Sequence, residues 1–224
     1  MPQPKFQFLI TLLVYTVIVR LLPYVLMNCD IQADPSVLYY PWNFSPLTAV
    51  CLFGGAFLAD RRTSFLLPLA TLFVSDIAIA VVSGHPEWGF PVTPEGAFTM
   101  TRFGRWIFTY ASFAIAIVLG SLLKGQKAKG LPAKALALGF SFEVVFFLAS
   151  NFLVWTNFGM SEAPIYPYTA AGLMTCYYVA LPFVTKSLLG TAAFTMLLFS
   201  PLGVQAATES DGEQHGKLAP VRVK

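Results

Sequence analysis

The sequence predicts an all-α integral membrane protein with six transmembrane helices, on three observations. Of its 224 residues, 56% are hydrophobic and only 11% are charged, whereas soluble domains carry about 25% charged residues. Six apolar runs alternate with polar loops along the chain. The aromatic content of 15% is typical of proteins with tryptophan and tyrosine belts at the membrane surface.

The predicted spans form one domain, residues 1–200, and the polar residues 201–224 are predicted to be a disordered cytoplasmic tail. The first run resembles a secretion signal, but it is too long for a signal core and contains Arg20, so it is predicted to be an uncleaved helix. The six spans cover residues 6–27, 46–59, 64–83, 105–123, 135–156 and 171–199, and residue 177 is an alternative start for the last.

The second span is unusual because it is short and has an irregular entry. Its apolar run has about 14 residues, fewer than the roughly 20 that cross a bilayer as a helix. The polar, proline-containing residues 43–46 precede it. Irregular backbone within a membrane is tolerated where protein or a water-filled cavity surrounds it, so these residues are predicted to form a cavity rim. The alternative is an ordinary helix start, with Ser45 as the N-cap and Pro46 at the first helical position.

The loop charges predict which side of the membrane each loop occupies. Lys5, Arg61, Arg62 and the four lysines of residues 124–134 would share one side, and Arg102 and Arg105 the other. The positive-inside rule then predicts that both termini are cytoplasmic. The outer loops are rich in polar and aromatic residues, which suits a protein that meets its ligand from outside. The net charge of +3 is too small to indicate nucleic-acid binding.

Four ionisable residues lie within predicted spans: Arg20, Asp76, Glu143 and Lys186. Each would cost about 2.5 to 3.5 kcal/mol at a helix centre, so each needs a partner, water or a function. Arg20 and Asp76 fall at similar depth in the outer half, and the other two fall nearer the middle. The sequence therefore predicts Arg20 with Asp76 as a structural charge pair. Glu143 and Lys186 either pair with each other or meet a charged group of a ligand.

Polar and aromatic residues near the outer ends of the helices predict a ligand site. Asn151 and Trp155 are one helical turn apart, and offer an amide for hydrogen bonds and a ring for stacking. The alternative is a satisfied core amide and an interfacial tryptophan. The predicted substrate-binding set is Asn43, Asn151, Trp155, Tyr166 and Tyr168, with Glu143 and Lys186 as the floor.

Motifs for catalysis, cofactors and metals do not occur in the sequence. The three cysteines lack metal-ligand spacing and make no disulfide framework. No nucleophile is paired with a base, so an enzyme is the weakest hypothesis, and no cofactor or metal is predicted.

Residues 40–200 resemble a family of bacterial six-helix membrane proteins usually described as transport proteins. The resemblance rests on Asn43-Phe-Ser-Pro, Phe53-Gly-Gly-Ala, Ser150-Asn-Phe with Trp155, and residues 177–190. That family in turn is similar to the S components of energy-coupling-factor transporters, which capture vitamins. The resemblance implies a bacterial inner-membrane location, a site near the outer face, and docking on a transmembrane coupling subunit driven by ATPases. Docking in that class uses an Ala-x-x-x-Ala face on helix one, which TLLVYTVIVR lacks here.

The function predicted from the sequence is capture of a small vitamin-like nutrient at the outer face for uptake, with the lipid bilayer and the nutrient as partners. The alternative is a structural or assembly subunit of a membrane complex that binds no ligand. A polar, aromatic-lined outer cavity would favour capture, and a filled bundle with an exposed face of small residues would favour the subunit.

Overall fold

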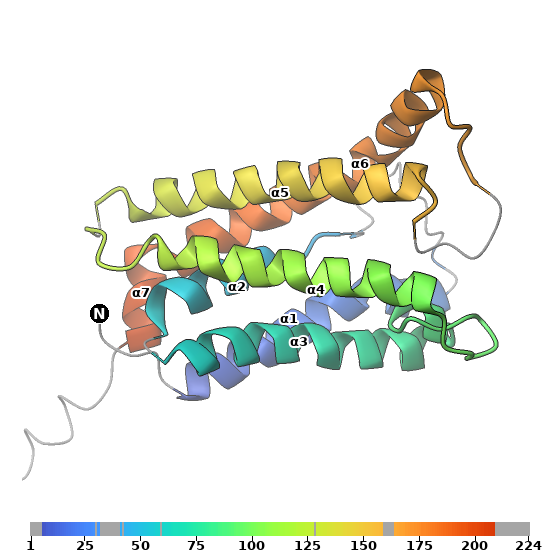
Figure 1. Cartoon of the computed structure of the whole chain (residues 1–224). Helices are drawn as coiled ribbons and strands as arrows, with labels where there is room; N and C mark the ends of the chain where they lie inside the picture. Colours follow the sequence, from blue (N-terminus) through green and yellow to red (C-terminus); the bar gives the residue numbers. More distant parts are fainter. Residues whose placement is uncertain are drawn as a thin grey trace, which may run out of the picture.

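The computed structural model describes residues 6–29, 31, 41, 43–58, 60–127, 129–158 and 164–208. These residues are all-helical apart from one isolated β-bridge between Val92 and Phe98. The long helices run side by side in a single bundle (Figure 1). The elements are α1 (Phe6–Asn28), α2 (Leu47–Phe57), α3 (Arg61–Ser83), the 3₁₀ turn η1 (Pro86–Trp88), α4 (Met100–Ser121), α5 (Leu131–Trp155), α6 (Ala170–Leu198) and α7 (Pro201–Thr208).

Five of these helices are long and apolar enough to cross a membrane, and they contain 22 to 29 residues each. They correspond to five of the six predicted spans. The second helix is short, as predicted: α2 has 11 residues and covers about 16 Å, roughly half of the hydrocarbon core. It ends at Leu58, whose backbone is extended, and Asp60 then caps α3 by accepting a hydrogen bond from the Thr63 amide.

Helix α2 lies inside the bundle, where it contacts α3, α4, α5 and α6 (Figure 1). All 11 of its residues are buried. A helix that is apolar on every face is expected to be surrounded by other elements. The bundle therefore contains a half-length helix enclosed by long ones.

Glycines bring α2 and α4 into backbone contact. A Cβ atom at Gly55 would lie 2.0 Å from the Ile117 carbonyl oxygen, and one at Gly120 would lie 2.3 Å from that of Leu52. Ser112 and Ala116 of α4 are buried as well. The small residues therefore serve close approach within the bundle, as in other membrane helix pairs.

The first part of the predicted disordered tail is helical instead. Residues 201–208 form α7, which packs against α6 and α1. Ala207 is fully buried in the apolar core cluster, and Gly203 lies against the end of α6. The local sequence PLGVQAA supplies a proline at the helix start and enough apolar side chains for packing. The rest of the predicted tail, residues 209–224, lies outside the described residues.

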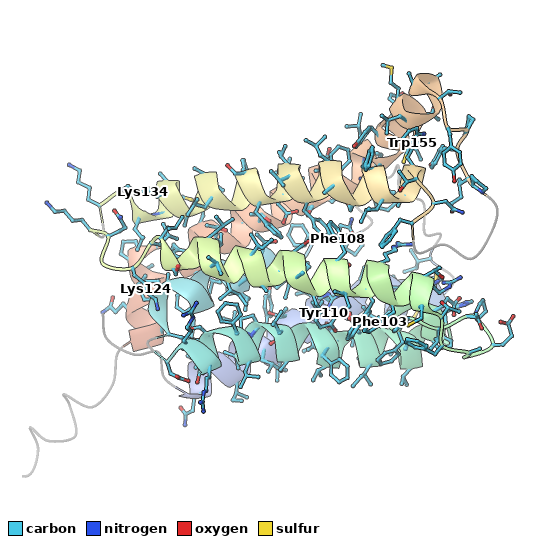
Figure 2. All side chains as sticks on the ribbon, viewed as in Figure 1. Phe103, Phe108, Tyr110, Lys124, Lys134 and Trp155 are labelled. Carbon is cyan, nitrogen blue, oxygen red and sulfur yellow. The ribbon has the colours of Figure 1, made fainter. Side chains whose placement is uncertain are left out.

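The two ends of the bundle differ in composition. Helices α1, α3 and α5 end where α4 and α6 begin, and this end carries Trp155 (Figures 1 and 2). The opposite end carries Lys124 and Lys134, and α7 lies there too (Figures 1 and 2). This arrangement is the one expected from the alternation of aromatic and basic loops along the sequence.

Candidate functional site

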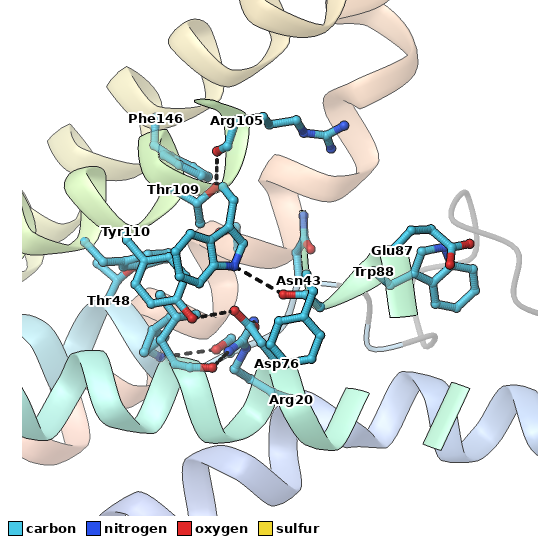
Figure 3. A pocket seen from close by; sticks show the side chains of 18 of the residues that line it. Arg20, Asn43, Thr48, Asp76, Glu87, Trp88, Arg105, Thr109, Tyr110 and Phe146 are labelled. Atoms are coloured by element: carbon cyan, nitrogen blue, oxygen red, sulfur yellow. Dashed lines mark hydrogen bonds and ion pairs between the residues drawn. The ribbon is translucent and has the colours of Figure 1, made fainter. Parts of the chain in front are cut away.

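A cavity of about 700 Å³ lies between α1, α3, α4 and the start of α2 (Figure 3). This volume is within the range of about 300 to 1,000 Å³ that is usual for small-molecule sites. Aromatic rings form part of the wall, among them Tyr24, Trp88, Trp106, Tyr110 and Phe146. The charged lining residues are Arg20, Asp76, Glu87, Arg102, Arg105 and Glu143.

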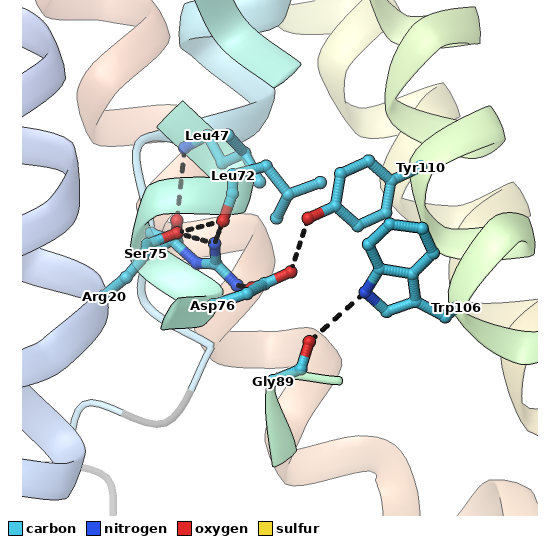
Figure 4. A network of polar contacts seen from close by, with 9 residues as sticks. Arg20, Leu47, Leu72, Ser75, Asp76, Gly89, Trp106 and Tyr110 are labelled. Atoms are coloured by element: carbon cyan, nitrogen blue, oxygen red, sulfur yellow. Dashed lines mark hydrogen bonds and ion pairs between the residues drawn. The ribbon is translucent and has the colours of Figure 1, made fainter. Parts of the chain in front are cut away.

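One wall of the cavity is a polar network centred on Asp76 (Figure 4). Arg20 Nη2 of α1 lies 3.0 Å from Asp76 Oδ1 of α3, and the Tyr110 hydroxyl of α4 donates to Asp76 Oδ2 at 2.8 Å. The same guanidinium donates to the Leu72 carbonyl at 3.2 Å and to the Ser75 hydroxyl. The structure therefore places Arg20 beside Asp76, the pair predicted from their similar depth in the membrane. It adds Tyr110 from a third helix.

The connection between α3 and α4 packs against this wall. A Cβ atom at Gly89 would lie 2.2 Å from the Asp76 carbonyl oxygen, so the loop backbone touches α3 directly. The Trp106 indole donates to the Gly89 carbonyl at 3.2 Å, and its ring lies 4.2 Å from that of Tyr110 (Figure 4). The loop backbone thus lies against α3 and forms part of the cavity wall near Asp76.

At the inner end of the cavity, Glu143 is surrounded by hydroxyl groups. Thr48 and Thr191 donate to its Oε1 at 2.6 and 2.8 Å, and Ser187 donates to its Oε2 at 2.6 Å. These donors come from α2 and α6, so Glu143 of α5 joins three helices. Its exposed fraction is 5%.

Lys186, the predicted partner of Glu143, is also buried, with an exposed fraction of 3%. The hydrogen bonds described at the Glu143 carboxylate come from hydroxyl groups. Matching by depth missed this, because serine and threonine carry no signal in a hydropathy pattern.

Helix α2 begins beside Glu143, halfway along the bundle. Glu143 is 12 residues from each end of α5, or about 18 Å from either end. Residues 44 and 45 lie against α6, since a Cβ atom at Gly190 would be 2.9 Å from the Ser45 nitrogen. Pro46 is the N-cap, and the Ser45 hydroxyl accepts from the Leu47 amide at 3.2 Å. The N-cap position therefore differs from the expected Ser45.

A second cavity of about 290 Å³ adjoins the first, between α4, α5 and α6. Both cavities are lined by Asn43, Arg105, Glu143 and Ser187. Asn43 has a left-handed backbone, with φ of 58°. Asn151 lines the second cavity, and its amide donates to the Phe147 carbonyl of its own helix at 2.8 Å. Three predicted site residues, Asn43, Glu143 and Asn151, therefore lie at the cavities.

Trp155 and Tyr168 pack together at the end of α5, and Tyr166 lies two residues before Tyr168 in the same connection. The Trp155 indole donates to the Pro167 carbonyl at 3.0 Å, and its ring meets the Tyr168 ring edge-on at 6.0 Å. Burial raises the pKa of the Tyr166 phenol. None of the three belongs to the described lining of either cavity. The predicted aromatic residues of the site therefore lie outside both cavities. The indole N–H of Trp155 is already bonded to the loop that follows α5.

Half of the aromatic and basic side chains that do line the larger cavity come from α4. Arg102 and Arg105 were counted as outer-loop charges, and Trp106 and Tyr110 were not singled out. Their signal was present in the sequence: two arginines three residues apart, then two large aromatic residues one turn apart, at the start of an apolar helix.

The fold and the cavities together define a helical bundle of the multi-pass membrane type, with a charged and aromatic interior. The chain belongs to a family of unknown function (DUF6580), which matches residues 2–210. No curated protein and no solved structure matches the chain.

Proposed function

We propose that this protein binds a small, ring-containing organic nutrient from the outer face of a bacterial inner membrane and serves its uptake. The observation that carries the proposal is the cavity of about 700 Å³, whose walls combine aromatic rings with a few charged groups. Sites for small molecules combine aromatic and apolar side chains with placed polar groups, and in this cavity the polar groups include six charged residues.

The half-length helix α2 supports the proposal. Transporters often place discontinuous helices at the membrane midplane, with their ends at the substrate site. Here α2 starts beside Glu143, and Leu47 and Thr48 of its first turn line the cavity. The proposed topology has six segments in an arrangement similar to S components, with both termini cytoplasmic and the aromatic end of the bundle outside.

The alternative of a subunit without a ligand has less support. The small residues that would form a docking face are used inside the bundle, where Gly55 and Gly120 hold α2 against α4. A coupling subunit with ATPases stays a proposed partner, and it would need a surface other than an Ala-x-x-x-Ala face on α1.

A thermal-shift panel of vitamins and heterocycles tests the proposal, with a matched pair of tryptophan variants. Both Trp106 and Trp155 donate to a loop carbonyl, at 3.2 and 3.0 Å, but only Trp106 lines the cavity. We expect some member of the panel to stabilise the purified protein. Trp106→Ala should lose that shift, and Trp155→Ala should keep it. The proposal fails if no member stabilises the protein or if both variants lose the shift equally.

A further inference from the structure

The second cavity is a branch of the larger one. Thr109 of α4 and Glu143 and Phe146 of α5 line both cavities, so the two spaces adjoin at these residues. From there the lining of the branch follows α5 as far as Val154, 11 residues beyond Glu143, or about 16 Å along the helix. The branch therefore extends the larger cavity toward the end of the bundle that carries Trp155.

Apolar side chains form much of the wall of the branch. Phe108 of α4, Phe147 of α5 and Phe183 of α6 line it from three helices, and Val154 and Val184 line it as well. An engineered apolar cavity of about 150 Å³ binds benzene. At about 290 Å³, the branch has room for an apolar group larger than a benzene ring.

The hydrogen-bond donors along the branch are engaged within the chain. The Asn151 amide and the Ser150 hydroxyl donate to the Phe147 carbonyl at 2.8 and 3.4 Å. The Thr109 hydroxyl donates to the carbonyl four residues earlier at 3.2 Å, and the Ser187 hydroxyl donates to a carboxylate at 2.6 Å. A polar ligand group would have to compete with these bonds, whereas an apolar group would leave them intact.

The charged residues of the branch lie where the two cavities adjoin. Arg105 and Glu143 line the larger cavity as well, and both have interactions within the chain. The rest of the described lining of the branch is uncharged. An apolar group can therefore lie along α5 beyond this boundary without covering a charged side chain.

Resting on the proposed function, we infer that the ligand has an aliphatic side chain and that this chain fills the branch. The ring lies in the larger cavity beside Trp106, and the chain passes Thr109 and Phe146 into the space along α5. Burial of the chain adds to the affinity in proportion to the apolar surface that it removes from water. The branch thereby selects ligands by their side chain, whatever groups the ring carries.

A series of N-alkyl nicotinamides, from methyl to butyl, tests this inference. The charged lining of the larger cavity comprises three basic and three acidic residues, so the probe is a ring without net charge. Dissociation constants are measured by thermal-shift titration of the purified full-length protein and are referred to the free probe concentration. The affinity should rise about fourfold with each added methylene, as expected for burial of a hydrocarbon chain.

Variants that fill the branch show where the chain binds. Ala180 and Val184 of α6 are one helical turn apart and both line the branch. Ala180→Phe should remove the gain, so that the butyl compound binds no better than the methyl compound, and Val184→Phe is a second filling variant should the first not fold. Ala193→Phe is the matched control, because Ala193 is exposed on α6 outside the described lining of both cavities. It should keep the full gain.

The inference is overturned if the butyl compound binds no better than the methyl compound in the wild type, if the gain survives in the filling variants, or if none of the series binds. Phospholipid that copurifies with the wild type but not with Ala180→Phe would assign the branch to a lipid tail and would overturn it as well. In each case a heterocycle that stabilises the protein through Trp106 would still support the proposed function. The two failures are therefore distinguishable.

Discussion

Asp76 is the residue that joins the elements forming one wall of the larger cavity. Its carboxylate meets Arg20 of α1 and Tyr110 of α4, and its backbone carbonyl lies against Gly89 of the loop. A buried charge that loses its partner costs far more than the pair contributes, because the remaining charge keeps its desolvation penalty. The pair is therefore sensitive to removal of one member and tolerant of removal of both.

Asp76→Ala should destabilise the protein by about 3 to 5 kcal/mol, because it strands Arg20 in the bundle. Adding Arg20→Leu should recover most of the loss. Thermal midpoints and folded yield in detergent measure both effects. Tyr110→Phe is the control: it removes one hydrogen bond to the charged carboxylate but leaves the ion pair, and it should cost about 1.5 to 3 kcal/mol. Equal losses in the single and double variants would show that the two charges do not depend on each other.

At the scale of elements, α2 decides how the bundle closes. Its two neighbouring glycines face different surroundings: a Cβ atom at Gly55 would lie 2.0 Å from the Ile117 backbone oxygen, whereas one at Gly54 would meet the Pro68 side chain at 3.2 Å. Alanine at either position gains similar helix propensity, about 1 kcal/mol. The environment alone therefore separates the two substitutions.

Gly55→Ala should sharply reduce folded yield, because a backbone atom of α4 cannot move aside without separating the helices. Gly54→Ala should be close to neutral, because a proline ring edge can shift by a few tenths of an ångström. Size-exclusion profiles and thermal midpoints of the two variants give the comparison. A Gly55→Ala protein as stable as Gly54→Ala would contradict the close α2–α4 contact.

The sequence could predict that α2 is short, because its apolar run lies between the proline-containing residues 43–46 and the charged residues 60–62. It could not predict that α2 starts halfway along the bundle, because a short apolar run does not specify the depth at which the helix begins. The hydroxyl partners of Glu143 were missed for a related reason: Thr48, Ser187 and Thr191 lie far apart in sequence and look like ordinary polar residues of apolar helices.

For the whole molecule, five long helices follow directly from hydropathy. Helices α1, α3 and α5 run one way along the bundle, and α4 and α6 run the other way (Figure 1). The candidate site could be predicted from the sequence only in part. Asn43, Asn151 and Glu143 lie at the cavities, whereas the aromatic residues of the outer loop do not. Depth along a helix is readable from sequence, but the direction that a side chain faces depends on helix rotation, which near-uniform hydrophobicity leaves undefined.

Both the orientation and the outward opening of the cavity can be tested by cysteine labelling in intact cells. In a background without Cys29, Cys51 and Cys176, an impermeant thiol reagent should label Glu95→Cys and should label Lys127→Cys only after the membrane is permeabilised. Both positions are exposed, and they belong to the connections at opposite ends of the bundle. Labelling of Lys127→Cys in intact cells would invert the topology.

Thr109→Cys then tests the cavity itself. Thr109 lines both cavities within α4, so a small charged reagent that enters from outside should reach it. Ser141→Cys is the control, because Ser141 is exposed on α5 but does not belong to the described lining of either cavity. Its thiol should face lipid, where a charged reagent does not partition and thiolates do not form. If Glu95→Cys is labelled and Thr109→Cys reacts no faster than Ser141→Cys, the cavity is closed to the outer face and uptake from that side is excluded for this conformation.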